Sequence, residues 1–186
     1  TIALQSWLNY LVSSRNVGML PPKKFKATAK LTASGPVSIT GCGRGASIIE
    51  FSGTTGMLEI GSTAAPSALP TIALDINPRS DVITFVAAHG LVEGDVFTVL
   101  DSTDYSWSPY RYYYRLGEMF EVEKVIGDTT VAVAGNPMVT IPTGANILCY
   151  KLPTSNGTHL SDFSIYRTGT NVLGAIHLKY QKNCVI

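Results

Sequence analysis

Two short apolar runs joined by a glycine-rich turn occupy residues 37–51, which read VSITGCGRGASIIEF. In the first run Val37 and Ile39 alternate with small polar residues, and this period of two predicts a β-strand. The second run, residues 48–51, is rich in β-branched and aromatic residues and again predicts a strand. A glycine-rich turn after a strand can hold a phosphate group, but a helix must then follow it. Because a second strand follows instead, we interpret residues 41–45 as a bend between strands.

Similar runs recur on both sides of this stretch, and glycine, serine or threonine turns separate them. They lie at residues 19–20, 25–29, 57–60, 163–166, 175–180 and 185–186. Short strands at even spacing predict an all-β fold. Residues 19–61 contain no Asn-Gly or Asp-Gly turn of the kind that joins antiparallel strands in tight hairpins. We therefore expect a solenoid of parallel strands, in which each coil buries its inner face by stacking on its neighbours.

A helix-like pattern lies at the start of the chain. Apolar residues within 2–12 recur at helical spacing, from Leu4 through Leu8 to Leu11, and Gly18 marks a stop. The first coil of a solenoid leaves one end of its core open, so the stack needs a terminal cap. We expect this helix to supply that cap.

The middle of the chain has a different pattern. Residues 62–80 are rich in small residues and proline, and alternating runs then lead to a Gly127-Asp128 turn that predicts an antiparallel hairpin. We infer an antiparallel β domain inserted into the solenoid. The expected division is a capping helix at 1–17, first coils at 18–79, the insert at 80–152 and resumed coils at 153–186. Since the chain starts inside a helical pattern and ends in a strand-like run, we expect it to be part of a longer protein.

Composition argues against several classes of protein. The net charge is only +1, so no overall electrostatic field favours binding to nucleic acid. The charges are uneven, because residues 1–49 hold six Lys or Arg and no acid. No apolar run is long enough for membrane insertion. The cysteines and histidines have no spacing typical of a metal site, and we expect no metal and no cofactor. We expect Cys42, Cys149 and Cys184 to be buried or half-buried thiols.

The densest chemistry lies in residues 101–115, DSTDYSWSPYRYYYR, which hold five of the nine tyrosines and one of the two tryptophans. Aromatic faces stack on sugar rings, and carboxylates and guanidinium groups bind sugar hydroxyls. The candidate sugar-binding residues are Asp101, Asp104, Tyr105, Trp107, Tyr110, Arg111, Tyr112 and Tyr114. The alternative is that these aromatic residues cover the core of the insert or a subunit interface, where Tyr, Trp and Arg are also enriched.

Carboxylates in and near this segment are candidates for catalysis only if two of them lie a few ångströms apart, as glycosidases require. Sequence spacing does not set that distance for the pair Asp101 and Asp104, or for Glu118, Glu121 and Glu123. Alternation places Glu121 and Glu123 together on one strand face, which is typical of charges that face solvent. No catalytic residue is assigned.

Four of these segments together resemble the start of pectate-lyase-like phage tailspikes. They are ALQSWL at residues 3–8, GMLP at 18–21, VSITGCGRG at 37–45 and IIEF at 48–51. That family has a capping helix of the form ALQxWL, a short strand that ends in Leu-Pro, and a glycine-rich bend between strands. The segment Pro22-Lys23-Lys24 departs from the Pro-Ala-Gly turn that is common there. The stretch from His89 to Glu118 resembles, more loosely, an insert of such proteins.

The resemblance implies a right-handed parallel β-helix in an elongated homotrimer of the phage tail, made in the host cytoplasm and in contact with other tail proteins. It implies binding to a bacterial capsular or O-antigen polysaccharide, with depolymerase activity in the full-length protein. Catalytic carboxylates of the family lie on later coils or between subunits, so this segment is not expected to be catalytic alone. Two alternatives stay open because a fold does not dictate an activity. One is a non-catalytic structural tail or adhesin module. The other is a bacterial polysaccharide lyase, whose calcium-binding Asp cluster is not evident in this sequence.

Overall fold

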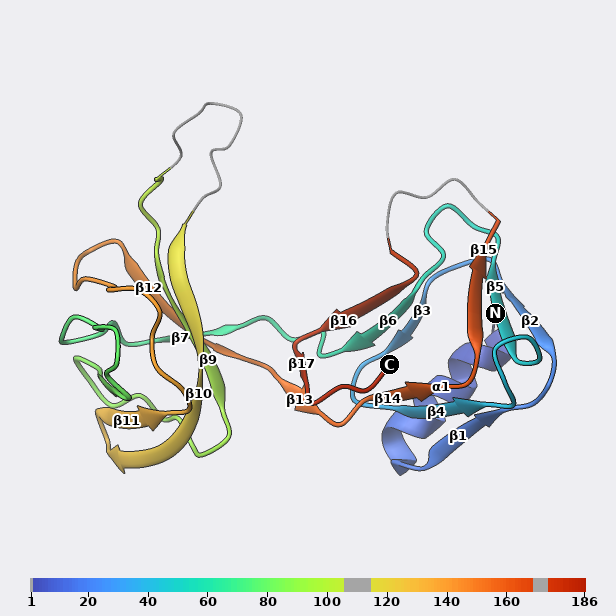
Figure 1. Ribbon diagram of the computed structural model, residues 1–186, viewed down its shortest axis with the longest axis horizontal. Coiled ribbons are helices and arrows are strands. Elements are labelled where there is room, and N and C mark those ends of the chain that lie inside the picture. The colour runs from blue at the N-terminus through green and yellow to red at the C-terminus, as the bar shows by residue number, and fades with distance from the viewer. Residues whose placement is uncertain (1, 106–114, 169–173) are drawn as a thin grey trace. The chain divides into compact units, whose positions relative to one another are not determined.

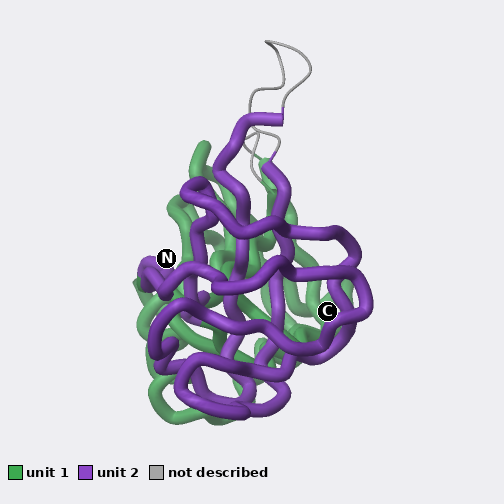
Figure 2. The backbone as a smooth tube through the Cα atoms, turned by 90° about the vertical axis from the view of Figure 1, so that its left-hand side faces the viewer, with its two compact units in different colours: residues 1–64, 154–186 green, residues 65–153 purple. Residues whose placement is uncertain are grey.

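The computed structural model describes residues 2–105, 115–168 and 174–186. The chain divides into two compact units: unit 1 comprises residues 1–64 and 154–186, and unit 2 comprises residues 65–153. Figure 2 colours unit 1 green and unit 2 purple. Each unit has its own cluster of buried apolar side chains.

Unit 1 contains three parallel sheets of three strands, and each successive pass of the chain adds one strand to every sheet (Figure 1). The first pass forms β1 (Val17–Leu20), β2 (Lys24–Ala27) and β3 (Leu31–Ala33). The second forms β4 (Ser38–Gly41), β5 (Ile48–Phe51) and β6 (Leu58–Gly61), and the third forms β14 (His159–Ser161), β15 (Ser164–Arg167) and β16 (Ile176–Lys179). A short parallel pair joins β13 (Ser155–Asn156) to β17 (Gln181–Lys182). The strands predicted on both sides of the glycine-rich bend are confirmed as β4 and β5.

The three passes are in register, so apolar side chains of successive passes lie in rows through the core of unit 1. Two such rows are Phe25–Ile49–Ile165 and Leu31–Leu58–Ile176. Parallel in-register neighbours bring like side chains into contact, and each row buries apolar surface that one pass alone would leave exposed.

The helix α1 (Ile2–Ser14) confirms the pattern over 2–12 and packs its apolar face against the first pass. Leu4, Leu8 and Leu11 are buried in the core of unit 1. A Cβ at Gly18 would lie only 2.4 Å from Leu11 Cδ1 and 2.5 Å from Trp7 Cζ2. Glycine at position 18 therefore lets the helix approach β1 more closely than any other residue would.

Gln5 of α1 makes a second contact with the first pass, this time with the backbone of β3. Its Oε1 accepts a hydrogen bond from the Thr32 backbone N–H at 2.9 Å, and its Nε2 donates to the Thr32 carbonyl at 2.6 Å. β3 is an edge strand of its sheet. The side-chain amide supplies the bonds that a further strand would make, which blunts an edge that could otherwise pair with another chain.

Unit 2 is a six-stranded antiparallel sheet in the order β7-β12-β9-β10-β11-β8. Its strands are β7 (Ser67–Leu69), β8 (Val82–Thr84), β9 (Val96–Asp101), β10 (Leu116–Gly127), β11 (Thr130–Val133) and β12 (Ile147–Leu152). The first part of β10 pairs with β9 and its last part pairs with β11. The hairpin predicted around Gly127-Asp128 is confirmed as the β10–β11 connection.

Aromatic rings fill the centre of unit 2. The Phe97 ring lies 5.6 Å from the Phe85 ring and 5.5 Å from the Phe120 ring, centroid to centroid, in tilted arrangements. Such geometry favours aromatic pairs beyond the area that they bury. His89 packs against Phe85 at 5.3 Å and is also buried.

The three cysteines differ in exposure, and the expectation for one of them is wrong. Cys149 is buried on β12 and Cys184 is partly exposed, as expected, but Cys42 is exposed. Cys42 follows β4 in the glycine-rich bend, where Ser47 Oγ accepts a hydrogen bond from its backbone N–H. The bend lies at the surface of unit 1, so Cys42 stays exposed even though its Sγ donates a hydrogen bond to the Leu20 carbonyl at 3.4 Å. Burial raises the pKa of the Cys149 thiol to about 11, so that cysteine stays protonated at neutral pH.

Candidate functional site

Residues 101–115, which we call the aromatic segment, connect β9 to β10 in the sheet of unit 2. Asp101, the last residue of β9, pairs with Leu116, the first residue of β10. Of the predicted sugar-binding residues, Asp101, Asp104 and Tyr105 are described by the structure. The others, Trp107, Tyr110, Arg111, Tyr112 and Tyr114, lie outside the described residues.

Asp101 anchors the base of this segment. Its side chain is only 4% exposed; Oδ2 accepts a hydrogen bond from the Tyr105 hydroxyl at 2.6 Å, and Oδ1 accepts one from the Thr103 backbone N–H at 2.8 Å. The hydrogen bond from Tyr105, followed by those from Thr103, holds the pKa of Asp101 below its ordinary value. The same bond to the carboxylate raises the pKa of the Tyr105 hydroxyl. Asp101 is therefore an ionised acceptor that positions its neighbours.

Two further contacts tie the base of the segment to the rest of unit 2. Asp104 Oδ1 lies 3.3 Å from Arg115 Nη1, in an ion pair whose side chains are both more than 40% exposed. Exposed pairs of this kind contribute little to stability. The Asn146 carbonyl accepts hydrogen bonds from both the backbone N–H and the hydroxyl of Ser102, at 2.8 and 2.9 Å. Tyr105 remains 53% exposed, so its ring is accessible to a ligand.

The glutamates of β10 divide between a structural role and an exposed face. Glu118 Oε1 accepts hydrogen bonds from the backbone N–H groups of Met138 and Val139, at 2.7 and 2.8 Å, and so fastens that loop to the sheet. Glu121 and Glu123 are both exposed, and the residue between them is buried, which confirms the predicted alternation. These hydrogen bonds explain the position of Glu118 as a structural one, without a catalytic role.

Two of the three histidines, His89 and His177, have roles that the described contacts explain. His89 Nδ1 accepts a hydrogen bond from the Leu91 backbone N–H at 2.9 Å, and its Nε2 lies 3.1 Å from the Gly127 carbonyl. His177 Nδ1 lies 3.1 Å from Glu59 Oε2. Among residues 2–105, 115–168 and 174–186, no three His, Cys, Asp or Glu side chains are grouped so that they could hold a metal ion.

Glu59 stands between two basic side chains on the outer face of unit 1. Its Oε1 lies 3.0 Å from Lys30 Nζ, while its other oxygen faces His177. The hydrogen bond from Lys30 is the main cause that lowers the pKa of Glu59, with His177 adding to it against the opposing effect of burial. The contacts cross from the first pass to the third and so link all three.

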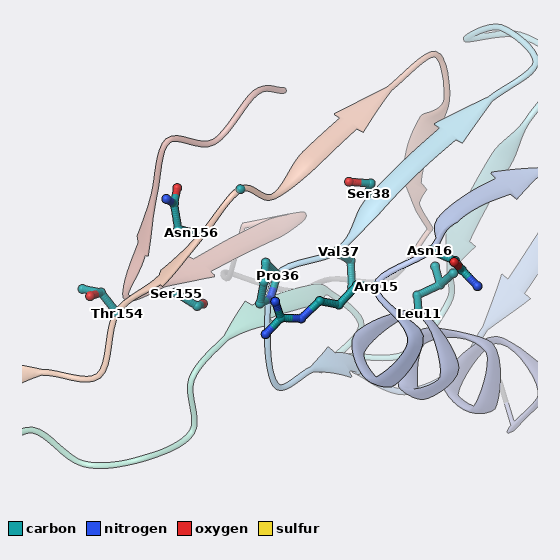
Figure 3. Close-up of a pocket in the computed structure, with 10 residues that line it drawn as sticks. Leu11, Arg15, Asn16, Pro36, Val37, Ser38, Thr154, Ser155 and Asn156 are labelled. Carbon is teal, nitrogen blue, oxygen red and sulfur yellow. The ribbon is translucent and has the colours of Figure 1, made fainter. Parts of the chain in front are cut away.

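A cleft of about 470 Å³ lies in unit 1, and the sequence patterns did not indicate it. Its lining comes from the end of α1, from the start of β4 and from the residues that lead into the third pass: Leu11, Arg15, Asn16, Pro36, Val37, Ser38, Thr154, Ser155, Asn156 and Gly157. Figure 3 shows the Arg15 side chain extending from the end of the helix toward Pro36, with Thr154, Ser155 and Asn156 on the opposite side. We call this the Arg15 cleft.

Three solved structures share this architecture. Tailspike protein gp49 from Pseudomonas phage LKA1 superposes with a TM-score of 0.71 and 28% identity, over 89% of this chain and 27% of its own. Pseudomonas phage phi297 tailspike gp61 superposes with a TM-score of 0.78 and 18% identity, over 95% of this chain and 29% of its own. This chain has a tailspike-like fold. The third structure is the gp54 tailspike of Acinetobacter baumannii bacteriophage AP22 in complex with A. baumannii capsular saccharide. It superposes with a TM-score of 0.71 and 21% identity, over 97% of this chain and 29% of its own.

The tailspike-like fold spans less than a third of the length of each of these proteins. No family model matches the sequence, and no curated protein matches it. In the described part of the chain, no helix has the length and apolar character needed to cross a membrane.

Proposed function

We propose that this chain is a section of a bacteriophage tail protein, carried on the virion, that binds a polysaccharide of the bacterial surface. The tailspike-like fold carries the proposal, because the match extends over 89% to 97% of the chain in three phage tailspikes. One of those, gp54, was solved with a capsular saccharide bound. A capsular or O-antigen polysaccharide is accordingly the proposed partner.

The three passes of unit 1 are proposed to be coils of a right-handed parallel β-helix. Each strand of a pass pairs in parallel with the strand that occupies the same place in the next pass. Crossover connections between parallel strands are right-handed in nearly all proteins, which favours that hand here. A homotrimer that contacts other tail proteins is part of the same proposal, and its support is the resemblance to the tailspike family.

The aromatic segment between β9 and β10 is proposed as a contact region for the polysaccharide. Its base is supported by the buried, ionised Asp101, and the exposed Tyr105 ring lies beside that anchor. A site whose supporting residues are fixed by hydrogen bonds loses less conformational entropy when a ligand binds. Asp104 and Arg115 add polar groups that can hydrogen-bond sugar hydroxyls.

Alanine variants of the aromatic segment test this part of the proposal. Trp107→Ala and Tyr112→Ala are expected to weaken polysaccharide binding about tenfold each, the equivalent of about 1.4 kcal/mol. Binding would be followed by isothermal titration with purified capsule, and assembly by light scattering. Tyr166→Ala is the matched control, because Tyr166 is an exposed aromatic residue on β15, in unit 1, and does not line the Arg15 cleft. Changed assembly together with unchanged affinity would instead support the structural-module alternative.

Depolymerase activity is proposed for the longer protein only. The release of new reducing ends from purified capsule would be measured with the longer protein and with this chain. Release is expected from the first and not from the second. Release by this chain alone would contradict the assignment and would direct attention to carboxylates within residues 1–186.

A further inference from the structure

The two units carry charges of opposite sign, which the net charge of +1 conceals. Unit 1 holds nine Lys or Arg and three acids, a formal charge of +6. Unit 2 holds five Lys or Arg and ten acids, a formal charge of −5. The excess of positive charge in unit 1 attracts anions, whereas the excess of negative charge in unit 2 repels them.

We propose that the Arg15 cleft of unit 1 binds the carboxylate of an acidic sugar, such as a uronic acid residue. The inference rests on the proposed polysaccharide function, and it narrows the ligand to carboxylated saccharides. It also locates a contact on unit 1, separate from the aromatic segment of unit 2.

Arg15 supplies the group that would meet the carboxylate. None of the ion pairs and side-chain hydrogen bonds among the described residues involves its guanidinium. Its backbone N–H bonds to the Leu11 carbonyl at 2.9 Å and its φ is 55°, so the main chain is fixed where the helix ends. A guanidinium presents a planar fork that matches the two oxygens of a carboxylate, and such paired, charge-assisted bonds are the strong ones.

The rest of the lining suits the other parts of a sugar. Asn16 and Asn156 carry amides, and Ser38 and Thr154 carry hydroxyls, which can bond to ring hydroxyls as donors or acceptors. Neither Asn156 nor Thr154 has a side-chain hydrogen bond within the described residues. Pro36, which is partly exposed, offers an apolar surface for the C–H face of a pyranose, and the buried Leu11 and Val37 lie behind it.

The charges around the cleft favour an anion. The acids of unit 1 are Glu50, Glu59 and Asp162, and none of them lines the cleft. Glu50 and Glu59 are already neutralised by lysines at 2.9 and 3.0 Å. The end of α1 contributes about half a negative charge from its free carbonyl groups, which is smaller than the full positive charge of Arg15.

The test uses a tetramer of galacturonic acid and the matching tetramer of galactose, which lacks the carboxylates. Binding to the chain would be followed by shifts of the Asn16 and Asn156 side-chain amide signals in NMR spectra. Arg15→Asn is the informative variant, because asparagine tolerates a positive φ and the helix end is preserved. Lys23→Gln removes one positive charge from unit 1 at an exposed position that does not line the cleft, and serves as the matched control.

Shifts with the galacturonate tetramer at millimolar concentration are expected, with affinity about tenfold weaker for the galactose tetramer and for Arg15→Asn. Lys23→Gln should bind as the original chain does. Equal binding of the two tetramers, an unchanged Arg15→Asn variant, or the lack of shifts at the cleft would each overturn the inference. Those outcomes leave the polysaccharide proposal standing, because the variants of the aromatic segment in unit 2 test it separately.

Discussion

Replacing Gly18 by alanine probes how closely α1 packs on the first pass. The new Cβ would lie 2.4 Å from Leu11 Cδ1 and 2.5 Å from Trp7 Cζ2, whereas ordinary van der Waals contact begins at 3.4 Å. Both side chains would have to shift by about 1 Å in a region that is already packed, which costs about 1–3 kcal/mol. Alanine also stabilises by about 0.4–1 kcal/mol through the unfolded chain. We expect a net loss of about 1–2 kcal/mol in the free energy of unfolding of unit 1.

A double-mutant cycle separates this contact from a general effect. Leu11 is 2% exposed, and Leu11→Ala alone is expected to cost about 2–5 kcal/mol because it leaves a cavity. That substitution also removes the Cδ atoms that would collide with a residue at position 18. Gly18→Ala should therefore cost less in the Leu11→Ala chain, where only the clash with Trp7 is left, with a coupling energy of about 0.5–3 kcal/mol.

Urea unfolding followed by Trp7 fluorescence measures these changes, in a Trp107→Phe background so that the signal reports on unit 1. Gly45→Ala is the matched control, since a Cβ there meets nothing within 4 Å. It should change the free energy of unfolding by less than about 0.5 kcal/mol. An unchanged stability for Gly18→Ala, or losses that simply add in the double variant, would refute the proposed packing.

Three further predictions concern single contacts. Gln5→Ala removes both hydrogen bonds to Thr32 and should lower the unfolding free energy by about 1 kcal/mol in the same urea assay; an unchanged midpoint would count against the edge-capping role. Folding lowers the pKa of Glu59, so its ionised carboxylate stabilises the folded state at any pH above the ordinary pKa of 4.5. This stabilisation is lost as the pH falls through the lower pKa of the folded state. The difference in urea midpoint between the original chain and Glu59→Gln should accordingly shrink from pH 7 to about pH 3, and a constant difference would contradict it. Asp101→Asn removes the charged acceptor, so an NMR titration should show the Tyr105 pKa falling toward 10.0, whereas no change would show that the carboxylate does not hold the hydroxyl.

Local pattern was sufficient to predict the parts of the fold that repeat. The alternation of Val37 and Ile39, and the strand-like run that ends at Phe51, predicted β4 and β5 because both bury one face. The spacing of Leu4, Leu8 and Leu11 predicted α1 for the same reason. The strand β7 was missed, because Ser67–Leu69 is short and carries no alternation, and it becomes a strand only through pairing with Cys149–Lys151 on β12.

The candidate site was predictable only where its residues are close in sequence. The aromatic segment is visible because its tyrosines are adjacent, yet the role of Asp101 depends on burial that no local pattern reveals. The Arg15 cleft brings Arg15 together with Thr154 and Asn156, which lie far along the chain and return to unit 1 only after the whole of unit 2. The contact of His89 was not predictable either, because the Gly127 carbonyl that its ring faces lies 38 residues along the chain, at the end of β10.

Binding of the labelled chain to a pair of bacterial strains that differ only in the capsule tests the central claim most directly. The strains would be ones to which the longer protein attaches, and bound fluorescence would be measured by flow cytometry. The expected result is saturable binding to the capsulated strain that purified capsule competes away, with background signal on the strain without capsule. Equal binding to both strains, or no binding to either while the longer protein binds the capsulated one, would contradict a polysaccharide-binding role for this section.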